Sequence, residues 1–225
     1  MNLPAAVMDL AHRLGASPEF CIAVRLTQSG TMQDKPDART MHFSAVQRIL
    51  LQRPEFEWTA RTGPLGLISV TDALRGGEPH LAVKALGWIP VASAPPDPQA
   101  AKGEMMRYLA ELAWAPDAIL QNPYLVWRVL DQDRLSVSLD SGSARAEIEI
   151  SLDREGRIFS VFAPDRPRKE GSRFVERPWS GRFSNYRRHA GRWLPFSGEV
   201  GWELGGEEFI AWRGELTSWS FERRA

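Results

Sequence analysis

The stretch QAAKGEMMRYLAELAW, residues Gln99 to Trp114, decides the fold because it separates two long series of predicted strands. It contains no proline and is rich in alanine, leucine, methionine, glutamate and arginine, which are good helix formers. The run Ala94-Pro95-Pro96-Asp97-Pro98 precedes it, and successive prolines suit neither a helix interior nor a central strand. Ala115-Pro116-Asp117 follows and ends it. We therefore predict one principal helix over residues 99–114.

Apolar and polar residues alternate on both sides of this helix, which is the pattern of strands with one buried face. Before the helix, the pattern predicts strands over Ile22 to Leu26, Met41 to Ile49, Phe56 to Arg61, Leu65 to Asp72 and Leu81 to Pro90. After it, strands are predicted over Leu125 to Leu130, Leu135 to Leu139, Ala144 to Leu152, Arg157 to Ala163, Gly181 to Arg188, Trp193 to Leu204 and Glu208 to Phe221. A short leading helix is predicted over Ala5 to Leu14, where apolar residues recur at helical spacing before Gly15.

Turn signals such as Asp140-Ser141-Gly142 and Gly205-Gly206 separate the predicted strands and favour antiparallel hairpins. A sheet of about a dozen strands curls rather than staying flat. The predicted fold class is therefore mainly β (α+β), with a large curved antiparallel sheet or half-barrel and the principal helix covering its concave face. Residues 1–225 are expected to form a single domain, because no long linker interrupts them.

The composition favours a folded protein with a sizeable core. Hydrophobic residues make up 43% of the chain. Lysine plus arginine and aspartate plus glutamate number 28 each, whereas nucleic-acid binders normally carry a basic excess, so nucleic acid is not an expected partner. No run approaches the ~18 apolar residues that cross a bilayer, and no basic segment precedes an apolar one at the start. We expect a cytoplasmic protein without a transmembrane segment, and its oligomeric state stays open.

Three groups of residues resemble a bacterial family of unknown function. They are Phe56-x-Trp58-x-Ala60-Arg61, Arg107-Tyr108-Leu109-x-Glu111-x-x-Trp114-x-Pro116, and Arg182-x-x-x-Tyr186 ahead of Pro195 and Trp202. The family itself implies no activity. More remotely, a strand-rich chain with a helix in mid-sequence is similar to the half-barrel fold of the periplasmic lipoprotein carriers LolA and LolB. That resemblance implies an apolar concave cavity for acyl chains, although this chain departs from those carriers in lacking a signal peptide.

The principal helix carries the best polar candidate site. Glu104, Arg107, Tyr108 and Glu111 fall at positions i, i+3, i+4 and i+7, which gathers them on one face. In one interpretation this face is exposed and carries ordinary helical ion pairs. In the other, Arg107 and Glu111 point into the concavity of the sheet as a paired polar group. We predict the second arrangement, because the first would leave Tyr108 wholly wet.

Tryptophan is the second candidate feature, with nine in the chain. Most belong to the core, but an indole ring can also line a pocket for an apolar or ring-bearing ligand and offer its N–H as a polar contact. Trp58 and Trp114 are selected because they belong to the motifs of the resemblance. The predicted ligand-binding residues are Trp58, Arg61, Arg107, Glu111 and Trp114.

Motifs of metal, nucleotide and nucleophile sites are absent from the sequence, so no catalytic residue, metal or cofactor is predicted. The leading hypothesis is a non-catalytic binding module that encloses an apolar pocket for a lipid-like or hydrophobic small molecule. One alternative is an enzyme that uses Glu111 and Arg107, with Asp117 or Asp165, for acid–base chemistry in a cleft. The other is a protein-interaction scaffold that pairs through a strand edge.

Overall fold

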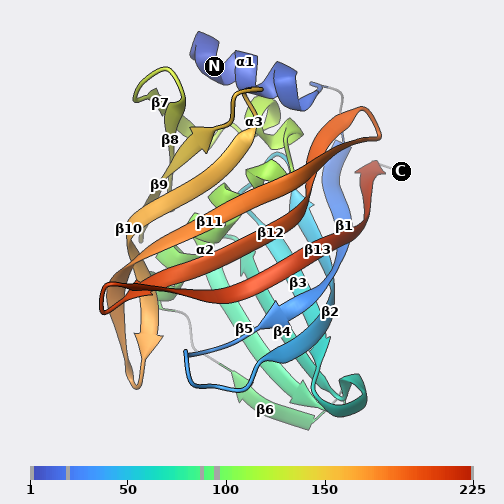
Figure 1. Ribbon diagram of the computed structural model, residues 1–225, viewed down its shortest axis with the longest axis vertical. Helices are drawn as coiled ribbons and strands as arrows, with labels where there is room; N and C mark the ends of the chain where they lie inside the picture. The colour runs from blue at the N-terminus through green and yellow to red at the C-terminus, as the bar shows by residue number, and fades with distance from the viewer. Residues whose placement is uncertain (1–2, 19–20, 87–88, 94–96, 224–225) are drawn as a thin grey trace.

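A computed structural model of the chain describes residues 3–18, 21–86, 89–93 and 97–223 (Figure 1). The strands before the helical middle of the chain are β1 (Cys21–Met32), β2 (Met41–Leu50), β3 (Phe56–Thr62), β4 (Ile68–Arg75), β5 (Glu78–Ala85) and β6 (Ile89–Ser93). The strands after it are β7 (Val126–Val129), β8 (Arg134–Asp140), β9 (Arg145–Leu152), β10 (Ile158–Glu170), β11 (Arg173–His189), β12 (Arg192–Leu204) and β13 (Glu207–Arg223).

The described strands form one 13-stranded sheet in the order β6-β5-β4-β3-β2-β1-β13-β12-β11-β10-β9-β8-β7. Neighbouring strands pair antiparallel throughout. The sheet consists of two meanders, β1 to β6 and β7 to β13, which join where β1 pairs with β13, for example at Val24 opposite Phe221. The two edges of the sheet are therefore β6 and β7, on either side of the helical middle in the sequence.

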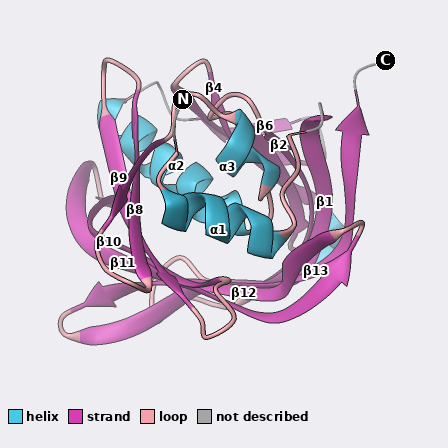
Figure 2. Ribbon diagram, turned by 90° about the horizontal axis from the view of Figure 1, so that it is seen from above, coloured by secondary structure: helices cyan, strands magenta, loops and turns pink. Residues whose placement is uncertain are grey.

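The helical middle leads from one edge of the sheet to the other. It consists of α2 (Pro98–Ala110), a 3-10 turn (Glu111–Ala113) and α3 (Asp117–Gln121); α1 (Ala5–Leu14) precedes β1, and a further 3-10 turn (Pro64–Gly66) follows β3. Figure 2 shows α1, α2 and α3 lying inside the curve of the sheet. α2 contacts β9 and β10 of the second meander and also β4 and β5 of the first. Among the described residues, no helix has the length and apolar character needed to cross a membrane.

α2 begins at a well-formed cap. The Asp97 carboxylate accepts hydrogen bonds from the backbone N–H of Gln99 at 2.7 Å and of Ala100 at 3.3 Å. Pro98 occupies the first turn, where a missing N–H costs nothing because that donor has no partner within the helix. The proline-rich segment before the helix thus ends in a strong start signal for it.

α2 is buried on more than one face. Met105 and Leu109 are fully buried, as the apolar stripe of the helix requires, and Tyr108 is fully buried as well. The Tyr108 O–H donates to the Leu50 carbonyl at 3.0 Å and accepts from the Asn122 amide at 2.8 Å. A helix buried nearly all round belongs to the interior of the molecule. The sheet must therefore supply partners for its polar side chains too.

The expectation of a mainly β chain with one large antiparallel sheet is confirmed. The leading helix has the bounds expected, whereas the principal helix is shorter, since α2 ends at Ala110 and passes into a 3-10 turn. The short helix α3 is not predicted from the sequence, because it begins at Asp117, within the segment that ends the principal helix. Part of the expected connector, residues 94–96, and residues 87–88 of one predicted strand lie outside the described residues.

β10 and β11 run further than expected, through Pro164, Pro167 and Pro178. Beyond Phe162, the described pairing of β10 is with β11 alone. Pairing of β11 with β12 begins only at Trp179. Each proline therefore lies where one side of its strand is unpaired, which is where a residue without an N–H is tolerated. The expected strands, Arg157 to Ala163 and Gly181 to Arg188, leave out these proline-containing parts.

Candidate functional site

An ion-pair network ties α2 to two strands of the first meander. Arg107 donates from Nη1 to Oδ2 of Asp72 on β4 at 2.5 Å and from Nε to Oε1 of Glu111 at 2.9 Å. Gln47 on β2 donates from Nε2 to the other oxygen of Glu111 at 2.5 Å. Glu111 is only 6% exposed. The structure thus places Arg107 and Glu111 inside the molecule, with both Glu111 oxygens hydrogen-bonded.

Burial sets the charge states in this region. It raises the pKa of Glu111 above its ordinary value, and Arg107 opposes that rise. Burial would lower the pKa of Arg107, but the neighbouring carboxylates, Glu111 first and then Asp72, raise it above its ordinary value. Glu104 lies one turn earlier on α2, and burial followed by the charge of Asp72 raises its pKa to about 8. Glu104 therefore holds a proton at neutral pH.

A cavity of about 170 Å³ lies beside the network. Its walls include five aromatic side chains, those of Trp58, Trp114, Trp179, Phe183 and Trp212. The side chains of Arg107 and Glu111 also line it. We call this space the aromatic cavity. It combines large apolar walls with a few charged groups, which is the usual character of a small-molecule site.

The rings around the aromatic cavity pack against one another. The centroid of Trp114 lies 5.3 Å from that of Phe183 and 6.2 Å from that of Trp212, both in edge-to-face contact. Phe43 lies 5.7 Å from Trp212 and 5.7 Å from Trp58, which links the two sides of the cavity. Such contacts fix ring orientation in addition to burying apolar area. The walls are therefore preformed.

Two paired glycines give the indole rings their space on the sheet. Gly198 on β12 lies opposite Gly214 on β13. A Cβ atom on Gly198 would lie 3.0 Å from the ring of Trp114, and one on Gly214 would lie 2.3 Å from the ring of Trp212. Both distances are shorter than carbon contacts allow. The two rings can approach the sheet this closely only because these glycines carry no side chain.

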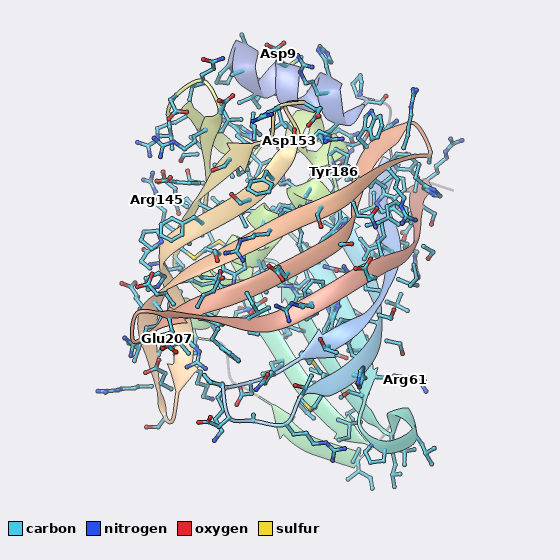
Figure 3. The ribbon with its side chains drawn as sticks, viewed as in Figure 1. Asp9, Arg61, Arg145, Asp153, Tyr186 and Glu207 are labelled. Carbon is cyan, nitrogen blue, oxygen red and sulfur yellow. The ribbon has the colours of Figure 1, made fainter. Side chains whose placement is uncertain are left out.

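Four of the five predicted binding residues line the aromatic cavity: Trp58, Arg107, Glu111 and Trp114. The fifth, Arg61, does not line it. Arg61 is exposed, because it lies three residues from Trp58 along β3 and alternate residues of a strand face opposite sides. Figure 3 shows Arg61 at the opposite end of the molecule from Asp9 of α1.

The other carboxylates considered for acid–base chemistry have different partners. Asp117 binds the guanidinium of Arg192 through contacts of 2.9 and 2.7 Å. Asp165 binds the Lys102 ammonium at 2.6 Å. Neither is joined to Glu111 by a hydrogen bond among the described residues. In the same part of the chain, no group of three or more His, Cys, Asp or Glu side chains is placed to hold a metal ion.

Arg166 and Trp179 also line the aromatic cavity, and the sequence analysis missed both as site residues. The Arg166 guanidinium lies 4.4 Å from the ring centroid of Trp179 and 5.5 Å from that of Trp202. The pairing of β10 with β11 shifts register between Ala163 and Arg166, in the proline-containing part of the strand. In a regular strand, every second side chain points to the same face, but a register shift interrupts this period. The sequence pattern therefore does not predict that Arg166 points inward.

A family model matches this chain over nearly its whole length, residues 1–214. The chain belongs to the family of unknown function DUF6544. No curated protein matches the chain. The sequence motifs that suggested a family of unknown function are thus confirmed as a family signal, and the function of this DUF6544 chain has to be argued from its structure.

Solved structures share the fold of the DUF6544 chain at 9–10% sequence identity. A LolA superfamily protein from Nitrosomonas europaea is 10% identical, with a TM-score of 0.53 and coverage of 99% of this chain and 95% of that one. A domain assigned as an outer membrane lipoprotein-sorting protein, from Vibrio parahaemolyticus, is 9% identical, with a TM-score of 0.55 and coverage of 96% and 90%. A DUF1329 family protein from Desulfovibrio piger is 10% identical, with a TM-score of 0.55 and coverage of 96% and 92%. The LolA-like fold expected from the sequence is confirmed.

The cytoplasmic location expected from the sequence is contradicted by these neighbours. The Vibrio parahaemolyticus structure is assigned to the sorting of outer membrane lipoproteins. The expectation rested on the first residues of the chain and on the lack of a long apolar run, and neither feature reports the compartment in which a protein of this fold works. We therefore correct it.

Proposed function

We propose that this chain is a binding protein that holds a hydrophobic small molecule, or the apolar end of a lipid-like one, in the aromatic cavity. The observation that carries the proposal is the cavity itself, about 170 Å³ beside the buried helix α2, with five aromatic side chains in its walls. Burial of apolar area would provide the main driving force for binding. α2 forms the inner wall through Ala110 and the start of the 3-10 turn.

The volume of the aromatic cavity limits the size of the ligand group that it can hold. An engineered protein cavity of about 150 Å³ lined by apolar side chains binds benzene. A space of about 170 Å³ therefore suits one or two fused rings, or a short or branched aliphatic group. A longer acyl chain would place only its end there and leave through the open side of the cavity.

The structural neighbours support a carrier or binding role as a precedent for the fold. One of them is assigned as an outer membrane lipoprotein-sorting protein. The site chemistry points the same way, because the two oxygens of Glu111 are already engaged by Arg107 and Gln47. A carboxylate held by two donors is well suited to structure and poorly suited to moving a proton. Binding is therefore favoured over acid–base catalysis.

The test uses a substitution on α2 that fills the aromatic cavity. Ala110 lies in its wall and is 4% exposed, so Ala110→Leu places three further carbon atoms in the space, whereas Ala110→Gly leaves it open. Titration with naphthalene, followed by quenching of tryptophan fluorescence and by calorimetry, should show saturable binding to the wild type and to Ala110→Gly. Ala110→Leu should bind at least about 10-fold more weakly, because the apolar space is occupied.

Circular dichroism establishes that each variant is folded. Val200→Phe fills the same cavity from β12 and replaces Ala110→Leu should that variant fail to fold. Equal binding to the wild type and to a folded cavity-filled variant would show that naphthalene binds elsewhere. Absence of binding to the wild type would refute the proposed function.

A further inference from the structure

The Arg166 side chain is a cation without a paired anion. Its guanidinium stacks on Trp179 and Trp202 at 4.4 and 5.5 Å. Its Nε atom is buried and has no hydrogen-bond partner, and no ion pair to Arg166 occurs among the residues that the structure describes. Buried cations in proteins are normally paired or hydrogen-bonded, because their desolvation is costly. Arg166 therefore lacks the partner that its position requires.

Two indole groups in the wall of the aromatic cavity lack partners as well. The Nε1–H groups of Trp58 and Trp179 are buried and make no hydrogen bond to the described residues. Trp114 in the same wall behaves in the ordinary way, because its Nε1–H donates to the Pro195 carbonyl at 2.9 Å. Buried indole N–H groups usually find an acceptor. The unpartnered atoms at Arg166, Trp58 and Trp179 are all donors.

The acceptors of this region do not satisfy them, since Gln47 Oε1 and Glu104 Oε2 are buried and make no hydrogen bond to these donors. Asp72 and Glu111 are held by Arg107, and Gln47 binds the second oxygen of Glu111. Glu104 is the carboxyl group whose charge acts most strongly on Arg166, but it forms no ion pair with Arg166 among the described residues, and burial raises its pKa to about 8. A protonated carboxyl group adds a donor instead of an anion. A bound molecule would supply the acceptor that these donors lack within the described residues.

We propose that Arg166, Trp58 and Trp179 form a subsite that binds the carboxylate of a hydrophobic carboxylic acid, whose apolar part occupies the aromatic cavity. The inference rests on the proposed function and names its ligand class. A carboxylate offers two coplanar oxygens, which match the planar fork of a guanidinium. It also provides lone pairs for both indole N–H groups. One ligand group thus satisfies all three side chains.

The surroundings provide a route for such an anion. Arg166 also lines a second, wider hollow of about 520 Å³, together with Lys169 and Arg173. Three acids also line this hollow: Asp72 is paired with Arg107, Asp97 caps α2, and burial raises the pKa of Glu104. The hollow therefore offers unpaired positive charge next to the aromatic cavity. Charged groups of one sign in a recess raise the local concentration of the opposite ion.

Gly103 leaves the approach to Arg166 open. A Cβ atom on Gly103 would lie 3.9 Å from Nε of Arg166 and 3.7 Å from the Pro167 carbonyl oxygen. These are ordinary contact distances, so α2 comes close to Arg166 at this glycine without crowding it. The space it leaves lies beside the buried donor.

The experiment compares three naphthalene probes: 2-naphthoate, its neutral amide 2-naphthamide, and naphthalene itself. Calorimetry at neutral pH should give wild-type affinity for 2-naphthoate about 10- to 100-fold above that for 2-naphthamide, as a charge-assisted contact with arginine predicts. In Arg166→Met, which keeps an unbranched apolar side chain, that preference should disappear, so that 2-naphthoate and 2-naphthamide bind with similar affinity. Trp179→Phe should reduce 2-naphthoate affinity about 5- to 10-fold.

Arg168→Met is the matched control. Arg168 lies on the same strand and also stacks on Trp202, at 5.8 Å, but it binds the Asp34 carbonyl at 2.9 Å and does not line the aromatic cavity. It should keep the full preference for 2-naphthoate. Wild-type protein that binds naphthalene without preferring the carboxylate would overturn the subsite and leave the proposed function standing. A preference that survives in Arg166→Met would also overturn it, and failure to bind any of the three probes would refute both.

Discussion

The Arg107 guanidinium lies 2.5 Å from the carboxylate of Asp72, so the principal helix is joined by an ion pair to β4, a strand of the first meander. The same guanidinium binds Glu111, the first residue of the 3-10 turn that follows α2, at 2.9 Å. It also lies over the rings of Phe56 and Trp58 at 4.7 and 5.2 Å. One side chain thus connects the helix, the first meander and the wall of the aromatic cavity. Removal of its partners should therefore lower the free energy of unfolding.

Glu111→Ala should lower the free energy of unfolding by about 3–5 kcal/mol, because it leaves a buried guanidinium with one carboxylate fewer and the Gln47 amide without its acceptor. Urea denaturation of the wild type and the variant measures the change. Glu176→Ala is the control, since Glu176 is 53% exposed and pairs with Lys102 at the surface, where about 0–1 kcal/mol is expected. Equal losses in the two variants would show that the Arg107 network contributes no more than a surface pair.

Glu104→Gln should raise stability at neutral pH and flatten its pH dependence. Glu104 has a pKa of about 8 in the folded protein, above the ordinary 4.5, so the folded state binds a proton that the unfolded state releases. This contribution makes stability fall as pH rises from about 4.5 to about 8. The variant removes that fall, and we expect a gain of about 1–3 kcal/mol at pH 7. Urea denaturation at pH 5, 7 and 8.5 tests it; an unchanged slope would contradict the buried, protonated state of Glu104.

Gly214→Ala should destabilise the protein by about 1–3 kcal/mol, because the added methyl group would meet the Trp212 ring. Gly103→Ala is the opposite case, since its Cβ meets nothing closer than 3.7 Å and alanine favours the helix, so a gain of up to about 1 kcal/mol is expected. Thermal unfolding should show a lower melting temperature for Gly214→Ala and a higher one for Gly103→Ala than for the wild type. A neutral Gly214→Ala variant would mean that Trp212 does not rest on the sheet at that glycine.

Arg166→Met should leave the ligand-free protein at least as stable as the wild type, although Arg166 is partly buried. The guanidinium loses hydration without gaining an ion pair, and its contacts with Trp179 and Trp202 are ones that methionine can also make. Arg107→Met should instead lower the free energy of unfolding by about 3–5 kcal/mol, because it leaves the carboxylates of Asp72 and Glu111 without their ion-pair partner. Chemical denaturation of Arg166→Met and Arg107→Met, measured under the same conditions, gives the two changes in unfolding free energy. A comparable loss in both would make Arg166 a structural residue.

The sequence predicts much of this site through helical spacing. Arg107 and Glu111 lie one helical turn apart, and the burial of Tyr108 beside them requires that face to point inward. Trp58 and Trp114 could be selected from their motifs. What local patterns cannot supply is which strand meets the helix, since Asp72 and Gln47 are reached only through the curvature of a sheet whose first and last strands pair.

Two arginines show where local sequence patterns fall short. Arg61 belongs to the same motif as Trp58, but the two side chains lie on opposite faces of β3, because alternate residues of a strand face opposite sides. Arg166 was missed because Pro164 and Pro167 on either side of it, and the register shift before it, hide the alternation that would place it inside. Arg61 and Arg166 show that the direction of a strand side chain depends on the exact register. On a helix, by contrast, an error of one residue in the position shifts the predicted face only in part.

The most direct test of the central claim, that the aromatic cavity holds a hydrophobic molecule, is native mass spectrometry of gently purified protein, followed by solvent extraction and mass analysis of the extract. The wild type should carry a bound species with an apolar part and a carboxyl group, released on extraction. Ala110→Leu, purified in the same way, should carry much less of it, because the variant fills the cavity. Wild-type protein that is free of any such species, and that also takes up none of the naphthalene probes, would contradict the account.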